Sequence, residues 1–268
     1  MLVARRNSFR VEAWDALKGF DFVCPGCQEP VVLKKGYKVV HHFAHHPDAE
    51  RRCSFGRGES IQHQTAKAMM AMSLRRRGWR TEVEYIPPED KRCRIDVITW
   101  PPHLRRGLVF EFQNTPIEPA EIFRRADNYA ELGYAQVWVP LWKPHLQEII
   151  ESKAYPKYVA APYERWIQGF NNGKGLWYYD PKTDHFRWAR LNPYRWEEEH
   201  VDRTHRYEGY SKRWRELELV VSAHSDNLLF MTQQRNAYET SHYKWPKCSR
   251  GVIYIDGWQL FVKQKDAA

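Results

Sequence analysis

Two short apolar runs that carry polar residues stand in the middle of the chain. Residues 94–100 read RIDVITW and residues 108–113 read LVFEFQ, so apolar side chains flank Asp96, Glu111 and Gln113. Alternate residues of a strand face the same side of a sheet, which places Glu111 and Gln113 together. A polar group among apolar neighbours costs a few kcal/mol unless it is paired. The pattern predicts two adjacent strands that bring Asp96 and Glu111 to one divalent metal ion with oxygen ligands.

A simpler interpretation of the two acids is an ion pair on the surface of a sheet. Such pairs between an arginine and a carboxylate are common and nearly neutral in energy. Under this interpretation the acids do no chemistry and pair with nearby arginines, namely Arg92, Arg94 or Arg106. The metal site is favoured, because polar residues on one face of an apolar strand are unusual without a site to serve.

Hydrophobic periodicity predicts the elements around these runs. After a polar approach at residues 54–59, a helix is expected to run to about Arg77 and to end at Gly78. A second helix is expected at residues 119–132. Strands are expected at residues 80–86, 94–100, 108–113 and 135–140. The predicted order is helix, three strands, helix, strand.

Polar residues one helical turn apart open the first of these helices. Glu59, His63 and Lys67 share one stripe, where Glu59 could face the same ion as the acidic pair. The alternatives are an acid stabilised by the helix dipole and an ordinary polar histidine. Lys67 on this helix and Arg124 and Arg125 on the second are candidate cations of the site, although a surface pair with a neighbouring acid is the alternative for Arg124.

A cluster of cysteines and histidines precedes the first helix. The chain has five cysteines, and this odd number, with three close to histidines, favours metal ligation over disulfides. The motif CPGC allows a tight turn, and a hairpin-like stretch, VVLKKGYKVV, precedes the histidines. A structural zinc ion needs four ligands. The predicted set is Cys24, Cys27, His45 and Cys53, with His42 as the substitute histidine; the alternative is a thiol pair in a turn with surface histidines.

Aromatic and basic residues alternate after residue 150. The segments GLWYYDPKTDHFRWARL and RGVIYIDGWQLFVK predict hairpins at PKTD and at IDGW. Such residues can stack on unpaired bases and bind phosphates. For most of them the aromatic core of a small β-rich domain is the better interpretation.

Net charge and hydropathy narrow the class of protein. Lysine and arginine number 42 against 33 acidic residues, and the net charge of +9 favours a polyanionic partner. No apolar stretch approaches the roughly 18 residues of a membrane span, and the first residues lack the apolar centre of a secretory signal. We therefore expect a cytoplasmic protein that binds nucleic acid and no membrane.

The motifs together resemble the competence protein CoiA-like family of the PD-(D/E)XK nuclease superfamily. The match covers most of residues 21–142 through CPGC, HHFAHH, ESIQH, RIDV, EFQNTPI and VWVP, and their order is more specific than any one motif. The resemblance implies a restriction-endonuclease-like αβββαβ core, here at residues 58–150. The predicted fold class is α/β (α+β), with an N-terminal zinc-binding module at 1–57 and an aromatic-rich, β-containing accessory domain at 151–268.

The resemblance also implies roles for the acidic pair. Asp96 and Glu111 would hold Mg²⁺ or Mn²⁺ together with the backbone carbonyl oxygen of Phe112. Glu59 matches the acidic position of the ESIQH motif. Gln113 takes the place of the motif lysine, and because an amide cannot supply positive charge, that charge must come from elsewhere. Lys67, Arg124 or Arg125 could supply it to a phosphate.

Three further residues correspond to motif positions of the same superfamily. His63 matches the histidine of ESIQH. Arg125 and Tyr129 are similar to the polar-xxx-Tyr feature of RecB-type nucleases, and one helical turn places both on one face. An arginine there can pair with phosphate.

These observations lead to one main hypothesis and two alternatives. The main hypothesis is a nuclease that hydrolyses DNA with Mg²⁺ or Mn²⁺ during DNA uptake or recombination, with recombination proteins as further partners. The first alternative is a nucleic-acid-binding protein with weak or no turnover, which Gln113 makes conceivable. The second is a zinc-stabilised interaction scaffold. The acids at positions 59, 96 and 111 argue against the first alternative, and the basic charge against the second.

Overall fold

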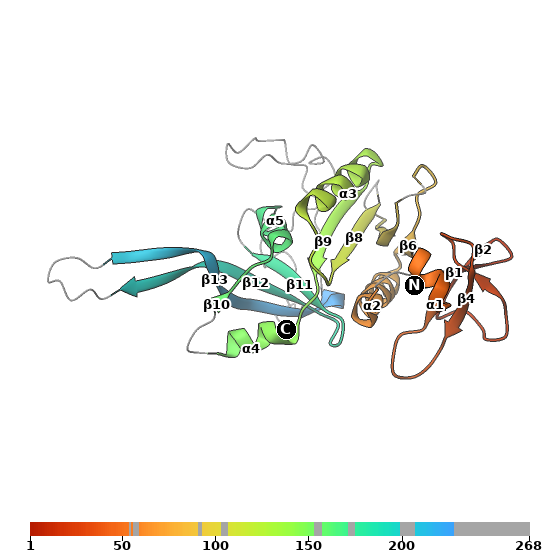
Figure 1. The fold of residues 1–268 in the computed structure, drawn as a ribbon, viewed down its shortest axis with the longest axis horizontal. Helices are drawn as coiled ribbons and strands as arrows, with labels where there is room; N and C mark the ends of the chain where they lie inside the picture. The colour runs from red at the N-terminus through yellow and green to blue at the C-terminus, as the bar shows by residue number, and fades with distance from the viewer. Residues whose placement is uncertain are drawn as a thin grey trace, which may run out of the picture.

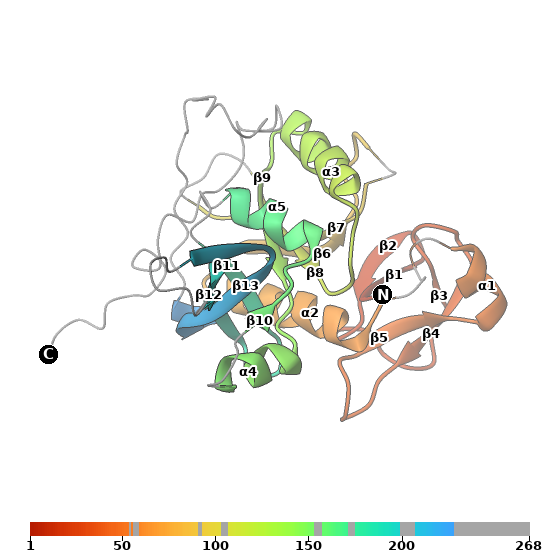
Figure 2. The same cartoon turned by 60° about the vertical axis from the view of Figure 1, so that its left-hand side comes forward.

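The chain folds around three β-sheets, as the ribbon views show (Figure 1, Figure 2). A five-stranded sheet forms the N-terminal part, a four-stranded sheet lies in the centre, and a second four-stranded sheet follows. The computed structural model describes residues 1–53, 55, 59–90, 93–102, 107–152, 157–170, 175–198 and 207–227. The expected mixed α/β composition is confirmed for this part of the chain.

The N-terminal sheet has the strand order β2-β1-β3-β4-β5 and is antiparallel throughout. Its elements are β1 (Val3–Arg6), β2 (Phe9–Glu12), β3 (Phe22–Val23), β4 (Pro30–Lys34), β5 (His42–His45) and α1 (Pro47–Arg52). Strands β4 and β5 form the expected hairpin, with Lys34 opposite His42. The histidines lie within its second strand rather than after it, because the side chain of Phe43 is buried in the core of this sheet.

The central sheet has the order β6-β7-β8-β9, in which the last pair is parallel. Its elements are α2 (Ile61–Arg76), β6 (Arg80–Tyr85), β7 (Ile95–Trp100), β8 (Leu108–Gln113), α3 (Pro119–Glu131) and β9 (Ala135–Pro140). This order of helix, three strands, helix and strand is the order predicted from the sequence. Helix α2 begins after Ser60, whose Oγ accepts a bond from the N–H of His63 at 3.1 Å. The chain leaves α2 and α3 through Gly78 and Gly133, both in left-handed conformations that favour glycine.

The two helices cover opposite faces of the central sheet. Residues of α2, such as Met70, pack with Val97 and Phe110 in one buried cluster. Residues of α3, such as Ile122, pack with Val109 in another. Alternation along each strand produces this division. Because Val97 pairs with Phe110, the next position of the ladder brings Asp96 beside Glu111.

The remaining described segment adds a third sheet, with the order β10-β13-β12-β11. Its elements are α4 (Pro144–Glu151), β10 (Lys157–Tyr158), α5 (Pro162–Phe170), β11 (Leu176–Asp180), β12 (His185–Glu198), β13 (Tyr207–His224) and the 3₁₀ turn η1 (Ser225–Asn227). The hairpin at PKTD joins β11 and β12, whereas the one expected at IDGW lies outside the described residues. No helix in the described ranges is both long enough and apolar enough to cross a bilayer.

Aromatic side chains of the third sheet pack against the central one. Trp177, Tyr179 and Trp188 belong to the same buried cluster as the α2 face of the central sheet. The rings of Tyr179 and Phe112 lie 5.5 Å apart between centroids. For these aromatics, a place in a core is the observed role. The boundary near residue 150 stays a prediction, and both buried clusters of the central sheet continue across it.

Candidate functional site

A cavity of about 300 Å³ opens at the start of α2 and at the ends of β7 and β8. Five of the residues singled out by the sequence line it: Glu59, His63, Asp96, Gln113 and Arg125. They come from four elements of the chain, and the start of α2, the strands β7 and β8 and the helix α3 bring them together. The cavity is therefore the place where the candidate chemistry can occur.

His63 lies between two carboxylates on one wall of this cavity. Its Nδ1 is 3.0 Å from Oε1 of Glu59, and its Nε2 is 2.9 Å from Oδ2 of Asp96. Burial disfavours the charged imidazole, but the two carboxylates outweigh burial and raise the pKa of His63 to about 9. The donor atoms of these three residues all lie within 4.8 Å of one another, so they could hold a metal ion.

The carboxylate of Asp96 is fixed by several contacts. Its Oδ2 also accepts a bond from the backbone N–H of Phe112 at 3.0 Å. Burial alone would raise the pKa of Asp96, but His63 and Lys67 lower it overall. Asp96 is therefore ionised at neutral pH and is fixed at the cavity wall.

Glu111 lies beside Asp96, but its carboxylate turns toward α3. Nη2 of Arg125 donates to Oε2 at 2.5 Å, and the hydroxyl of Tyr129 donates to Oε1 at 2.5 Å. Burial and the neighbouring Asp96 raise the pKa of Glu111 to about 7, although Arg125 and Tyr129 act in the opposite direction. Its side chain is 1% exposed and is absent from the cavity lining. The carboxylate therefore does not reach the cavity in this structure, contrary to the predicted arrangement.

Lys67 is fully buried behind the cavity wall. Its Nζ forms ion pairs with Glu59 and with Glu84, the latter at 2.6 Å. Burial would lower the pKa of Lys67, but the carboxylates outweigh this effect and raise it. The predicted phosphate contact would require the ammonium group in the cavity, whereas the structure places it behind Glu59. Lys67 therefore holds Glu59 in position rather than facing a substrate.

Glu84 is a member of this network that the sequence did not predict. Its φ angle of 47° is left-handed, so Val83 and Glu84 are both buried and the alternation along β6 is interrupted. Its Oε2 accepts a bond from the N–H of Val3 at 3.2 Å. The buried network thus joins the N-terminal sheet to the wall of the cavity.

Replacing Lys67 by methionine is expected to destabilise the protein by about 3–5 kcal/mol, because Glu84 would lose its ion pair in the core, while Glu59 would keep only the N-terminal ammonium and His63. Thermal or chemical unfolding measures the change. The double substitution Lys67→Met with Glu84→Gln should recover part of the loss, since it removes the buried carboxylate that has lost its ion pair. Equal stability of Lys67→Met and the unmodified protein would contradict this account of the network.

The other predicted cations lie in different surroundings. Arg124 is exposed and donates two bonds to Glu121, at 2.8 and 2.7 Å, as in the surface ion pair that was the alternative. Tyr129 is fully buried and reaches Glu111 rather than the cavity. Arg92 and Arg106 lie outside the described residues. Of the two arginines predicted to bind phosphate, Arg125 lines the smaller cavity and Arg124 does not.

Gln113 keeps its side chain at the mouth of the cavity. Its Nε2 donates to the backbone carbonyl of Thr115, and the neighbouring Asn114 donates to Oγ of Ser60 at 2.7 Å. The second bond connects the end of β8 to the start of α2. The amide is thereby positioned at the cavity but supplies no charge.

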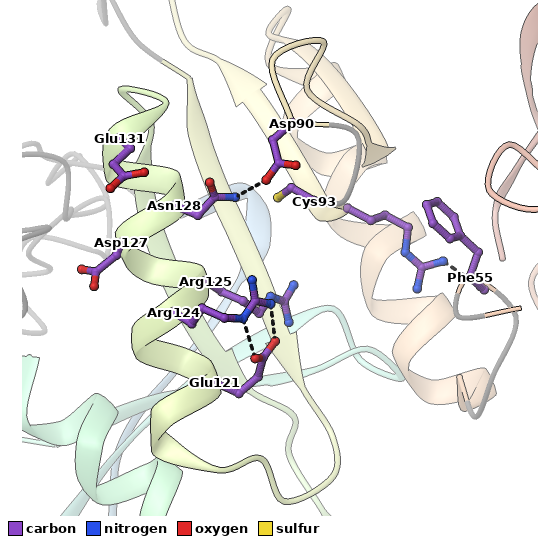
Figure 3. Close-up of a pocket in the computed structure, with 10 residues that line it drawn as sticks. Phe55, Asp90, Cys93, Glu121, Arg124, Arg125, Asp127, Asn128 and Glu131 are labelled. Atoms are coloured by element: carbon purple, nitrogen blue, oxygen red, sulfur yellow. Dashed lines mark hydrogen bonds and ion pairs between the residues drawn. The ribbon is translucent and has the colours of Figure 1, made fainter.

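The sequence named Arg94 only as a possible ion-pair partner of the two acids, and did not predict that it lines this cavity. It also lines a second, larger cavity of about 650 Å³, which Arg124 and Arg125 border from α3 (Figure 3). The signal was its position in the sequence, because Arg94 precedes Asp96 by two residues, just before β7 begins.

The cysteine and histidine cluster comes together in the N-terminal sheet. Sγ of Cys24 is 3.7 Å from Sγ of Cys53, and Sγ of Cys27 is 3.3 Å from Nε2 of His45. A tetrahedral zinc ion with bonds of about 2.3 Å to sulfur separates its sulfur ligands by roughly 3.8 Å. All four donor atoms lie within 4.8 Å of one another, so the cluster fits a closed metal site.

His42 stands apart from this cluster. Its Nδ1 lies 2.9 Å from the carbonyl oxygen of Val40, and strand alternation places it on the opposite side of β5 from Phe43 and His45. His45, the predicted histidine ligand, lies beside the cysteines, and His42, the predicted substitute, does not.

Comparisons with protein families give two matches. The model for the competence protein CoiA N-terminal domain matches residues 7–56, and the model for the competence protein CoiA nuclease-like domain matches residues 59–217. The chain belongs to the competence protein CoiA family. The CoiA nuclease-like match begins at Glu59, contains both acids of the central strands and continues into β13. Neither the search of curated proteins nor the search of solved structures gives a match.

Proposed function

We propose that this CoiA-family protein is a metal-dependent nuclease that hydrolyses phosphodiester bonds of DNA. The match to a nuclease-like domain supports the general class. The observation that carries the proposal is the cavity in which His63 joins Glu59 and Asp96, with Glu111 adjacent. The element order αβββαβ supports a restriction-endonuclease-like core of the PD-(D/E)XK type. The charge of +9 suits a polyanionic substrate.

The donor groups of the cavity fit Mg²⁺ or Mn²⁺. Carboxylate oxygens suit both ions, and Mn²⁺ also accepts an imidazole nitrogen. We assign Asp96 and His63 to the ion, which would take the place of the proton on Nε2 of His63, and Glu59 to holding Nδ1 of His63 so that Nε2 faces the site. Glu111 is the neighbouring carboxylate, with Oε1 3.4 Å from the N–H of Asp96. A bound ion would polarise the scissile phosphate and lower the pKa of the attacking water.

The residues around the ion site would bind and orient the substrate. Arg125 presents a guanidinium group, which can pair with phosphate in a bidentate manner. Gln113 can donate to a phosphate oxygen or orient a water molecule through its amide. The N-terminal cluster, which we assign to zinc, would serve the fold, because its four protein ligands leave no open position.

A second candidate function is a DNA-binding protein with little or no turnover. The specific observation in its favour is that Arg125 and Tyr129 hold the carboxylate of Glu111 away from the cavity. Such a protein would use the same cavity to bind phosphate. It would show DNA affinity that falls steeply with salt but no metal-dependent product.

The deciding experiment incubates the purified protein with plasmid DNA and with single-stranded DNA, with no added metal, with Mg²⁺ and with Mn²⁺. We expect cleavage only with added metal and a higher rate with Mn²⁺, because an imidazole and carboxylates share the site. The metal-free sample should be prepared by dialysis with a check of zinc content, since a strong chelator would also attack the cysteine cluster. Salt-dependent binding without cleavage under all conditions would favour the second function.

A further inference from the structure

Arg94 stands at the border of both cavities, between the N-terminal sheet and the central sheet. Its Nη1 donates to the backbone carbonyl of Phe55 at 2.7 Å, and its guanidinium carbon lies 4.8 Å from the centre of the Phe55 ring. Figure 3 shows Phe55 on one side of the larger cavity and the arginines of α3 on the other. Phe55 thus holds the guanidinium group of a residue that lines both cavities, and a guanidinium has five N–H donors, of which this bond uses one.

The other cations around the site are engaged by carboxylates. Lys67 pairs with two acids, Arg124 with Glu121, and Arg125 with Glu111. Within the described residues, no carboxylate oxygen lies within 4.0 Å of the Arg94 guanidinium. Carboxylates at a longer distance, led by Glu84, nevertheless outweigh burial and raise its pKa. Arg94 is therefore a charged donor whose short contacts, unlike those of its neighbours, are not with acids.

We propose that Arg94 binds the scissile phosphate of the substrate and supplies the positive charge that Gln113 cannot. This assignment rests on the proposed phosphodiester chemistry of the cavity. Arg94 and Asp96 both line the smaller cavity, so a phosphate at Asp96 is within reach of the Arg94 side chain. Its planar group can give two parallel hydrogen bonds to phosphate oxygens.

The same geometry makes Phe55 and Gly26 positioning residues. Phe55 packs against the buried cluster that contains Cys24 and Cys53. Gly26 lies in the turn of CPGC, and a Cβ atom at this position would lie 2.5 Å from Cδ2 of Phe55. The cysteine turn therefore supports the ring, and the ring supports Arg94. Through this contact the N-terminal module acts on the phosphate site.

The test of Arg94 compares cleavage and DNA binding of Arg94→Ala, Arg94→Lys and the control Arg5→Ala. Arg5 is exposed on β1, so its loss removes one charge without touching the site. We expect Arg94→Ala to lower kcat/KM by about 10²-fold, as for other donors to a developing charge. Arg94→Lys should recover part of this loss because it keeps the charge but not the planar fork. The control should remain within about twofold.

The test of the positioning residues uses two glycines of the same module. Gly26→Ala should lower the rate about tenfold with unchanged zinc content, because its Cβ displaces the Phe55 ring. Gly36→Ala is the matched control, since a Cβ there meets no atom within 4 Å. Phe55→Leu leaves the turn intact and should give a similar loss. In the Arg94→Ala background, Phe55→Leu should add little, because both act through one group.

The outcomes separate this inference from the proposed function. If the unmodified protein cleaves DNA and Arg94→Ala does so equally well, the inference is wrong and the function stands. If the unmodified protein does not cleave DNA, the proposed function is wrong. Binding of a short oligonucleotide then tests whether Arg94 contacts phosphate. If the salt dependence of the oligonucleotide affinity falls in Arg94→Ala by about one phosphate contact, the role of Arg94 is supported. If the salt dependence is unchanged, that role is overturned. Full additivity of Phe55→Leu and Arg94→Ala overturns the link to the cysteine turn.

Discussion

Replacing Asp96 by asparagine is expected to lower the rate of metal-dependent DNA cleavage by at least about 10³-fold. The carboxylate of Asp96 faces the cavity, and His63 and the N–H of Phe112 fix its orientation. Asparagine keeps the size of the side chain but removes the charge that attracts a divalent ion. A bound ion supplies several kcal/mol of charge stabilisation, and a loss of about 4 kcal/mol corresponds to a factor of roughly 10³. Single-turnover cleavage with saturating Mn²⁺ measures the effect.

The controls for Asp96 separate chemistry from folding. Glu29→Gln removes a carboxylate from an exposed position of the N-terminal module and should cleave at the unmodified rate. Asp96→Asn should retain its zinc and most of its salt-dependent DNA binding, because the basic side chains remain. Glu111→Gln tests the second carboxylate, which Arg125 holds in this structure. If the double variant Asp96→Asn/Glu111→Gln forms as much product as the unmodified protein, the cavity is not the active site.

The strands of the central sheet could be predicted because their signal is local. Apolar residues alternate or run together in RIDVITW and LVFEFQ, and proline, glycine and charged residues separate these segments. Glycines at positions 78 and 133 likewise end the two helices in left-handed conformations. The register that brings Asp96 beside Glu111 follows once these strands are neighbours. The backbone positions of the acidic pair could therefore be predicted from the sequence, although the partners of their side chains could not.

The buried network around Lys67 was not predictable in the same way. The stripe of Glu59, His63 and Lys67 follows from helical spacing, but that spacing does not say which member is buried. The partner, Glu84, turns inward only because its backbone adopts a left-handed angle, which local alternation would not suggest. The orientation of Glu111 depends on Arg125, which lies on a separate helix. Side-chain partners from distant segments decide such details, and one sequence does not contain them.

Replacing His45 by alanine is expected to abolish zinc binding and to unfold the N-terminal sheet, which is the largest stability effect we expect. The core of this sheet is small and includes Cys24, Phe22, Phe43 and Cys53, and domains of this size usually need a metal or disulfides to fold alone. Structural zinc contributes about 10–16 kcal/mol of binding free energy at neutral pH. Zinc analysis should give about one ion per unmodified chain, as a closed tetrahedral site requires. Thermal unfolding should show the loss of the N-terminal transition.

His42→Ala and Cys93→Ser are the matched controls for this prediction. His42 contacts the carbonyl of Val40 on the other side of β5, and Cys93 lies at the larger cavity, so both variants should keep zinc and the unmodified melting curve. Zinc loss in His42→Ala with retention in His45→Ala would transfer the ligand role to His42. A zinc-free, fully stable unmodified protein would remove the metal assignment. Because Phe55 packs on the cysteine turn, His45→Ala should also cleave DNA more slowly.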